Sequence, residues 1–141
     1  MKDRIEAIRK EAETAVREGS TCIVLSDKEF SGKKASIPSI LTVGAVHSHL
    51  VKHGLRGYCS LNVECSDAMD THSFAILIGV GATTVNPYLA IDSIYQRFEK
   101  KLFGKSDFET CVSKFKKSID AGLLKIMSKM GISVISSYRG G

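Results

Sequence analysis

Apolar side chains recur every three or four residues near the start of the chain, which is the spacing of one face of an α-helix. Gly19 follows this stretch and is a typical stop signal. The next apolar run, TCIVLSD at residues 21–27, is short and has the composition of a buried strand. We therefore expect an amphipathic helix and then a strand. The helical positions are Ile5, Ile8, Ala12, Ala15 and Val16.

Helical and strand patterns continue to alternate along the chain. A loop over residues 28–36 leads to a helix from Pro38 to His53, and Gly54 is placed to end it as a left-handed cap residue. Residues 58–65, YCSLNVEC, have the composition of a strand. The remaining predicted elements are a helix capped by Asp70, a strand at 83–86, a helix at 88–101, a long helix from Asp107 to Gly131, and a last strand with its exit at 132–141.

Short strands separated by helices predict a single α/β domain over residues 1–141. Parallel strands need a crossover between them, so the alternation predicts βα units and a parallel sheet of about four strands, resembling part of a (β/α) barrel. A length of 141 residues with 43% hydrophobic content suits one globular domain. We find no sequence repeat and no low-complexity segment.

Charge and composition narrow the classes of partner. Lys and Arg total 20 against 15 Asp and Glu, but the basic residues are spread along the chain, so we expect no nucleic-acid partner. The charged amino terminus lacks the apolar core of a secretory signal, and no apolar run is long enough to cross a bilayer. We therefore expect a cytoplasmic protein without a membrane partner, whose four cysteines are reduced thiols, with Cys22 in the core.

Polar residues gather where the predicted strands end. In parallel α/β folds the carboxyl ends of the strands meet at one edge, where ligands and partners bind. This edge is either a set of solvated loops or a docking or ligand surface. No serine, cysteine or carboxylate has an assigned partner base, so we assign no catalytic or cofactor-binding residue. The candidate face consists of Ser26, Asp27, Glu64, Asn86, Tyr138 and Arg139.

Three histidines lie within seven residues, His47, His49 and His53. His49 and His53 are four apart and share one helical face, a spacing that zinc sites use. Leu50 stands where a zinc hydrolase helix has its glutamate, and no third ligand is near in the sequence. We therefore expect no metal, and instead histidines that pack or cap the helix end.

Two other motifs are incomplete. Cys59 and Cys65 on one continuous strand would be separated by roughly 20 Å, too far to share an iron–sulfur cluster or a disulfide. GVGA at residues 79–82 lacks the third glycine of a dinucleotide fingerprint and follows a helix instead of a strand. Neither motif predicts a cofactor in this chain.

Four blocks in order carry a family resemblance from about Arg4 to the end of the chain. They are LSD, IPSILTVGAVHSHLVKHGLR, SFAILIGVGATTVNPYLA and GLLKIMSKMGISVISSYRGG. Together they resemble the central domain of the glutamate synthase large subunit. The family usually has three consecutive histidines where this chain has His47, Ser48 and His49, and a second histidine at Ser73. These departures argue against a required metal site.

The resemblance implies a role inside a larger enzyme. The family converts glutamine and 2-oxoglutarate to two glutamates: an amidotransferase domain releases ammonia, which passes through a tunnel to an FMN-bearing barrel. The FMN, the iron–sulfur cluster and the amidotransferase nucleophile lie outside the matched blocks. The chain is therefore expected to be a structural domain whose partners are the amidotransferase and FMN domains, inactive alone and prone to self-association.

Some questions stay open at this stage. SYRGG is normally followed by more chain in the family, so we expect a piece truncated at both ends, the C-terminal portion of a central domain. The electron donor of the parent, NAD(P)H or ferredoxin, has no determinant here. The alternatives are an independent α/β enzyme or ligand-binding domain with a site at the strand ends, and a basic nucleic-acid module.

Overall fold

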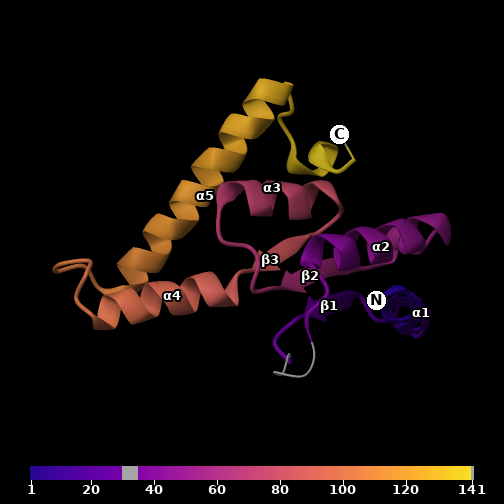
Figure 1. Cartoon of the computed structure of the whole chain (residues 1–141). Coiled ribbons are helices and arrows are strands. Elements are labelled where there is room, and N and C mark those ends of the chain that lie inside the picture. Colours follow the sequence, from indigo (N-terminus) through magenta and orange to yellow (C-terminus); the bar gives the residue numbers. More distant parts are fainter. Residues whose placement is uncertain (30–34, 141) are drawn as a thin grey trace.

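The computed structural model describes residues 1–29 and 35–140, so the loop expected over 28–36 lies partly outside the described residues. Helices and short parallel strands alternate in the first two thirds of the chain, and helices make up the rest (Figure 1). The elements are α1 (Lys2–Arg17), β1 (Cys22–Ser26), α2 (Ser39–Lys52), η1 (Arg56–Tyr58), β2 (Ser60–Glu64), α3 (Thr71–Gly79), β3 (Thr84–Asn86), α4 (Tyr88–Glu99), α5 (Phe108–Met130) and η2 (Ile135–Tyr138).

The described strands form one parallel sheet in the order β1-β2-β3. Leu25 of β1 lies opposite Val63 of β2, which in turn lies opposite Val85 of β3. The expected α/β class and the parallel βα units are confirmed. The described chain contributes three strands, where about four were expected.

No strand forms at residues 132–140, the described part of the segment expected to hold the last strand. Its middle is the short 3₁₀ helix η2, and the Gly140 amide donates to the carbonyl oxygen of Gly79 at the end of α3, 3.0 Å away. Long helix α5 packs against α3, so it carries the chain end to α3 and away from the open edge of β3 (Figure 1). Because the segment lies away from that edge, it has no strand to pair with.

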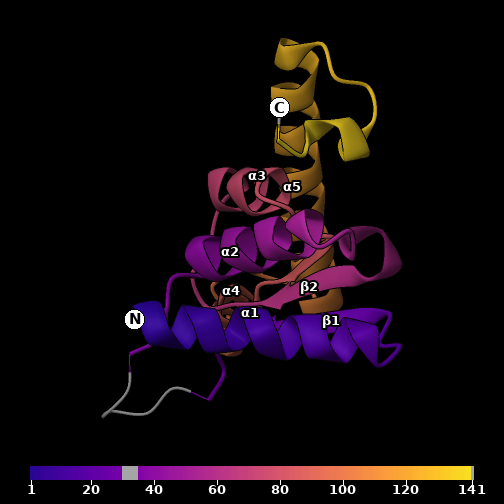
Figure 2. The ribbon, with the colours of Figure 1, turned by 90° about the vertical axis from the view of Figure 1, so that its right-hand side faces the viewer.

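Helices α1, α2 and α3 lie side by side, and the core forms between them and the sheet (Figure 2). Leu61 and Val63 of β2 are buried toward α2, whose Val43, Val46 and Leu50 are fully buried. The alternate positions on β1 and β2, such as Val24, are exposed or half-buried. The strands therefore alternate as expected for a sheet covered by helices on one face.

The predicted helix ends agree with local capping chemistry. Asp70 and Asp107 accept hydrogen bonds from backbone N–H groups in the first turns of α3 and α5. Gly54 and Gly131 have left-handed backbone angles directly after α2 and α5. Cys22, expected in the core, is instead exposed. Among the described residues, no helix is both long and apolar enough to span a bilayer.

Candidate functional site

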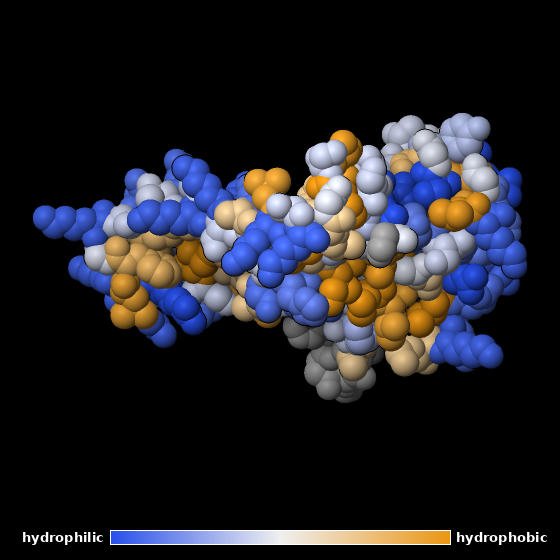
Figure 3. All heavy atoms as spheres, turned by 90° about the horizontal axis from the view of Figure 1, so that it is seen from above, coloured by the Kyte–Doolittle hydropathy of each residue, from blue (hydrophilic) through white to orange (hydrophobic). Residues whose placement is uncertain are grey.

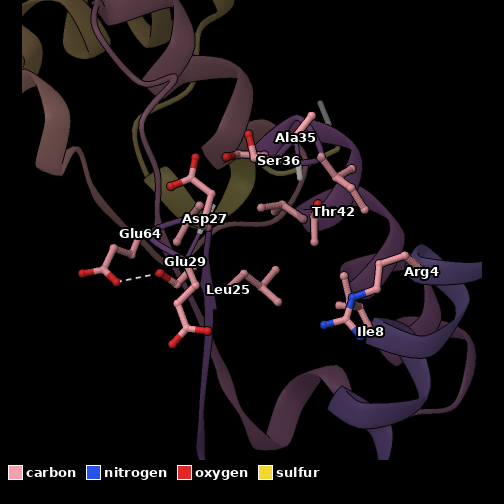
Figure 4. Close-up of a pocket in the computed structure, with 14 residues that line it drawn as sticks. Arg4, Ile8, Leu25, Asp27, Glu29, Ala35, Ser36, Thr42 and Glu64 are labelled. Atoms are coloured by element: carbon pink, nitrogen blue, oxygen red, sulfur yellow. Dashed lines mark hydrogen bonds between the residues drawn. The ribbon is translucent and has the colours of Figure 1, made fainter. Parts of the chain in front are cut away.

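Glu64, at the carboxyl end of β2, joins polar side chains from all three strand ends. Its carboxylate accepts a hydrogen bond, 2.8 Å long, from Ser26 at the end of β1 (dashed line at Glu64 in Figure 4). It also accepts one, 3.2 Å long, from the side-chain amide of Asn86 at the end of β3. The Lys28 ammonium lies 2.6 Å from the same carboxylate. The side-chain hydrogen bond from Lys28, and to a smaller degree the one from Ser26, lowers the pKa of Glu64. Parallel pairing causes this convergence, because it places the three strand ends at one edge.

Asp27 extends the same edge. Its Oδ2 accepts hydrogen bonds from the backbone N–H and the hydroxyl of Ser66, at 3.0 and 2.6 Å. Its Oδ1 is buried and has no hydrogen-bond partner among the described residues, and the same holds for the hydroxyl of Tyr88. Burial, and next the neighbouring Asp27 carboxylate, raise the pKa of Tyr88. The Tyr88 hydroxyl therefore lies close enough to Asp27 for the two groups to interact, although neither atom makes a hydrogen bond of ordinary geometry within the described chain.

A hollow of about 730 Å³ opens beside this edge. Figure 4 shows Asp27, Glu29 and Glu64 on one side of it and Arg4, from α1, on the other. The wall next to the strands is therefore acidic, and Arg4 opposes it. A group that binds there needs hydrogen-bond donors or positive charge toward the strand ends.

The structure brings Ser26, Asp27, Glu64 and Asn86 together, as the sequence predicted, while their role as an interdomain face stays a prediction. Tyr138 does not join them, because it lies against Gly79 at the end of α3: a Cβ added to Gly79 would be 3.6 Å from its ring.

Arg139 also lies elsewhere. Burial is the main cause that lowers the pKa of both His47 and Arg56, and the positive charge of Arg139 adds to it, so Arg139 sits near those residues and not at the strand ends. The sequence placed Tyr138 and Arg139 after a strand that does not form. Without that strand there is no carboxyl end to bring them to the acidic edge.

Arg56 organises a second polar cluster that the sequence did not reveal. Its guanidinium donates to the carbonyl oxygens of Cys59 and Gly81, to the Thr83 hydroxyl, and to Nδ1 of His47 at 3.1 Å. Because Nδ1 of His47 accepts this bond, the proton of the neutral ring is on Nε2. Burial, followed by the charge of Arg56, lowers the pKa of His47. His47 is therefore a packing residue, as expected.

His49 and His53 occupy the other side of α2. His49 is buried, and its Nε2 lies 2.7 Å from the carboxylate of Glu13 in α1. His53 is the C-cap residue of α2, and its Nδ1 lies 2.8 Å from the His49 carbonyl oxygen. His49 thus packs between α1 and α2, and His53 caps the end of α2. The carboxylate of Glu13 was not foreseen, since it comes from a helix 36 positions earlier.

The cysteines do not form a cluster site. Cys59 and Cys65 flank β2, whose five residues form a continuous strand between them, and both are free and buried. Burial raises the pKa of the Cys65 thiol to about 11. A thiol held in its protonated form is a poor metal ligand and a poor nucleophile.

A comparison with known proteins accounts for this chain over its whole length. The sequence profile described as the glutamate synthase central domain matches residues 1–141. The chain belongs to this family. It is 55% identical to the glutamate synthase [NADPH] large chain of Azospirillum brasilense over 141 residues, which is all of this chain and 9% of that protein.

Other central-domain relatives are more distant. The large chain of the NADPH enzyme of Bacillus subtilis is 45% identical, over 92% of this chain and 8% of that protein. The ferredoxin-dependent, chloroplastic enzyme of Spinacia oleracea is 42% identical, over 99% of this chain and 9% of that protein. The chain thus spans less than a tenth of the length of these relatives. The segment is shared by enzymes named for different electron donors.

Proposed function

We propose that this chain serves as a structural domain of a glutamate synthase large chain, between an amidotransferase domain and an FMN domain. The parent enzyme would make two glutamates from glutamine and 2-oxoglutarate, for glutamate biosynthesis and ammonia assimilation. The observation that carries this proposal is the family match over residues 1–141. The relatives bearing the glutamate synthase name are far longer than this segment, which leaves room in them for further domains.

The strand-end edge is the surface that we assign to a neighbouring domain. Ser26, Lys28 and Asn86 are already paired with Glu64, so this edge is a preorganised polar surface. Buried Oδ1 of Asp27 and the Tyr88 hydroxyl would gain partners from donors on the opposing domain. In a complete large chain, the hollow beside the edge would then be filled by protein.

The sheet itself fits this role. Its order β1-β2-β3, with helices α1, α2 and α3 side by side, supports the proposal that the chain resembles part of a (β/α) barrel. Both outer strands, β1 and β3, have an edge without a strand partner in the described chain. We propose that neighbouring segments of the parent extend this sheet. The parent would hold the FMN and the iron–sulfur cluster outside the present chain and act in the cytoplasm.

A charge reversal in the complete large chain tests the interdomain role. Glu64→Lys places a cation beside Lys28 and is expected to lower glutamine-dependent glutamate formation at least about tenfold by disturbing the contact between domains. Glutamine hydrolysis by the amidotransferase domain should persist. Glu18→Lys is the matched control, since Glu18 is exposed at the end of α1 and makes no side-chain contact recorded for the described residues. Unchanged glutamine-dependent glutamate formation in the Glu64→Lys variant would refute the proposal.

A second candidate function is a ligand-binding domain with its own site at the strand ends. The hollow of about 730 Å³ favours it. Titration of this chain with FMN, followed by fluorescence quenching, and an assay for glutamate formation from glutamine, 2-oxoglutarate and a reductant separate the two functions. We expect neither saturable micromolar binding nor turnover. Saturable micromolar FMN binding, or turnover, would favour the ligand site over the structural role.

A further inference from the structure

We propose that Glu13, His49 and His53 form a binding site for one Zn²⁺ ion that joins α1 to α2. One ligand atom of each residue, a carboxylate oxygen and two imidazole nitrogens, lies within 4.8 Å of the others. Two histidines and a glutamate are a ligand set that zinc enzymes use. The sequence shows only the two histidines, and the tertiary structure adds the third ligand.

The two imidazoles already share one side of α2. His49 and His53 are one turn apart, and their ring centroids lie 4.3 Å from each other. Packing of α1 against α2 brings the Glu13 carboxylate to 2.7 Å from Nε2 of His49. The site is thus built across a helix–helix contact, so an ion bound there would resist separation of the two helices.

The surrounding hydrogen bonds orient the ligands. The His49 carbonyl oxygen can only accept, so Nδ1 of His53 carries the proton and Nε2 of His53 keeps its lone pair free for a metal. This is the usual outer contact of a metal-bound histidine. Arg17 donates to Oε1 of Glu13 at 2.8 Å, which holds the carboxylate while Oε2 faces His49.

Binding would change the tautomer of His49. Without metal, the contact between His49 and Glu13 needs a proton on Nε2 of His49, because a carboxylate only accepts. Zn²⁺ needs the lone pair of Nε2, so the ring proton of His49 would move to Nδ1, and Oε2 of Glu13 would change from a hydrogen-bond acceptor to a ligand. The His49 side chain is 9% exposed, so its nitrogen is largely shielded from water. His53 is exposed, which leaves a path for the ion and a place for water as fourth ligand.

The ion identity follows from the ligands and the spacing. Imidazole nitrogens favour zinc over calcium or magnesium, which prefer oxygen. Two ligands bound at ~2.0–2.2 Å to one tetrahedral zinc lie about 3.5 Å apart. The three ligand atoms lie within 4.8 Å of one another. The most distant pair must therefore move about 1 Å closer together to bind one zinc ion. Rotation of the exposed His53 side chain supplies this shift, and a small rotation of the Glu13 side chain opens its 2.7 Å contact with His49, without movement of the helices.

Calorimetric titration of the purified full chain with ZnCl₂, after treatment with a chelator, tests the site. The titration is made in a Cys22→Ser background, because Cys22 is an exposed thiol that could bind zinc. We expect one ion per chain with a micromolar Kd, and a melting temperature that rises with zinc concentration. His53→Gln is expected to weaken binding at least about tenfold and to abolish the rise in melting temperature.

The matched control is His72→Gln. His72 is an exposed histidine on α3, outside the cluster, and its replacement should leave zinc affinity unchanged. Glu13→Gln should weaken binding as His53→Gln does, and circular dichroism without metal verifies that each variant is folded. The proposal is overturned if the titration shows no saturable zinc binding with a Kd below about 100 μM. It is also overturned if folded His53→Gln binds zinc as the parent does.

Discussion

Gly81 lies directly against the imidazole ring of His47. A Cβ atom added at Gly81 would be 2.3 Å from Cγ and Nδ1 of that ring. The backbone of Gly81 also has φ of +121°, which side-chain-bearing residues rarely adopt. The turn that leaves α3 therefore passes α2 closely only because position 81 has no side chain.

Gly81→Ala is expected to destabilise the fold by about 2–4 kcal/mol, because the steric overlap adds to the backbone strain. Urea unfolding followed by circular dichroism measures the change. Gly19→Ala is the control: its φ is +97°, but nothing lies within 4 Å of the added Cβ. That variant isolates the strain, about 1–2 kcal/mol. Equal losses in the two variants would show that the His47 contact is not tight.

The guanidinium of Arg56 cannot be replaced by an ammonium. Lysine presents a single charge and cannot reach His47, Gly81 and Thr83 together from one plane. We expect Arg56→Lys to lower the free energy of unfolding by about 2–3 kcal/mol, from lost hydrogen bonds to partly buried acceptors. Arg97→Lys, at an exposed position on α4, should change it by less than about 0.5 kcal/mol. A cost no larger than that of Arg97→Lys would contradict the role of Arg56.

Acid should destabilise α3 through its cap. Hydrogen bonds from the Ser73 backbone N–H and hydroxyl lower the pKa of Asp70 below its ordinary 3.8. A carboxyl whose pKa is lower in the folded state contributes stability above its unfolded pKa, and this is lost as the pH falls through the folded pKa. Asp70→Asn retains a cap that does not titrate. Its stability should fall less steeply below about pH 4 than that of the parent, with 3.8 as the ordinary pKa.

The close contact between α3 and α5 depends on Gly122. A Cβ there would lie 2.5 Å from Cγ2 and 2.6 Å from Oγ1 of Thr71. Gly122→Ala should destabilise by about 1–3 kcal/mol despite the better helix propensity of alanine. Adding Thr71→Ala removes both of these atoms and should recover part of the loss. A double-mutant cycle measured by urea unfolding gives the coupling, and purely additive effects would exclude the steric explanation.

Exposed apolar side chains should cause the isolated chain to self-associate. Leu124 on α5 is 64% exposed and Val134 is 55% exposed. Apolar groups interrupt the charged surface on the face that Figure 3 shows. Light scattering should report concentration-dependent dimers or larger species at micromolar protein. Leu124→Glu should reduce association and Lys125→Glu should not. A clean monomer for the unmodified chain would contradict this prediction.

Features that depend on neighbouring residues could be predicted from the sequence. The apolar spacing of α1, the caps at Asp70 and Asp107, and the glycine that ends α5 act within one or two helical turns, so their chemistry is visible locally. The gathering of Ser26, Glu64 and Asn86 was also predictable, because parallel strands bring their carboxyl ends to one edge.

Features that depend on distant contacts required the tertiary structure. Apolar composition at 132–141 suggested a strand, but a strand needs an edge to pair with, and the direction of α5 leads this segment to α3 instead. Similarly, no local pattern links Glu13 to His49, which are 36 positions apart, or His47 to Gly81. Residue types and their spacing determined the elements of this protein, whereas the packing of α1, α2 and α3 decided which polar side chains meet, because such contacts form only when separate elements share one core.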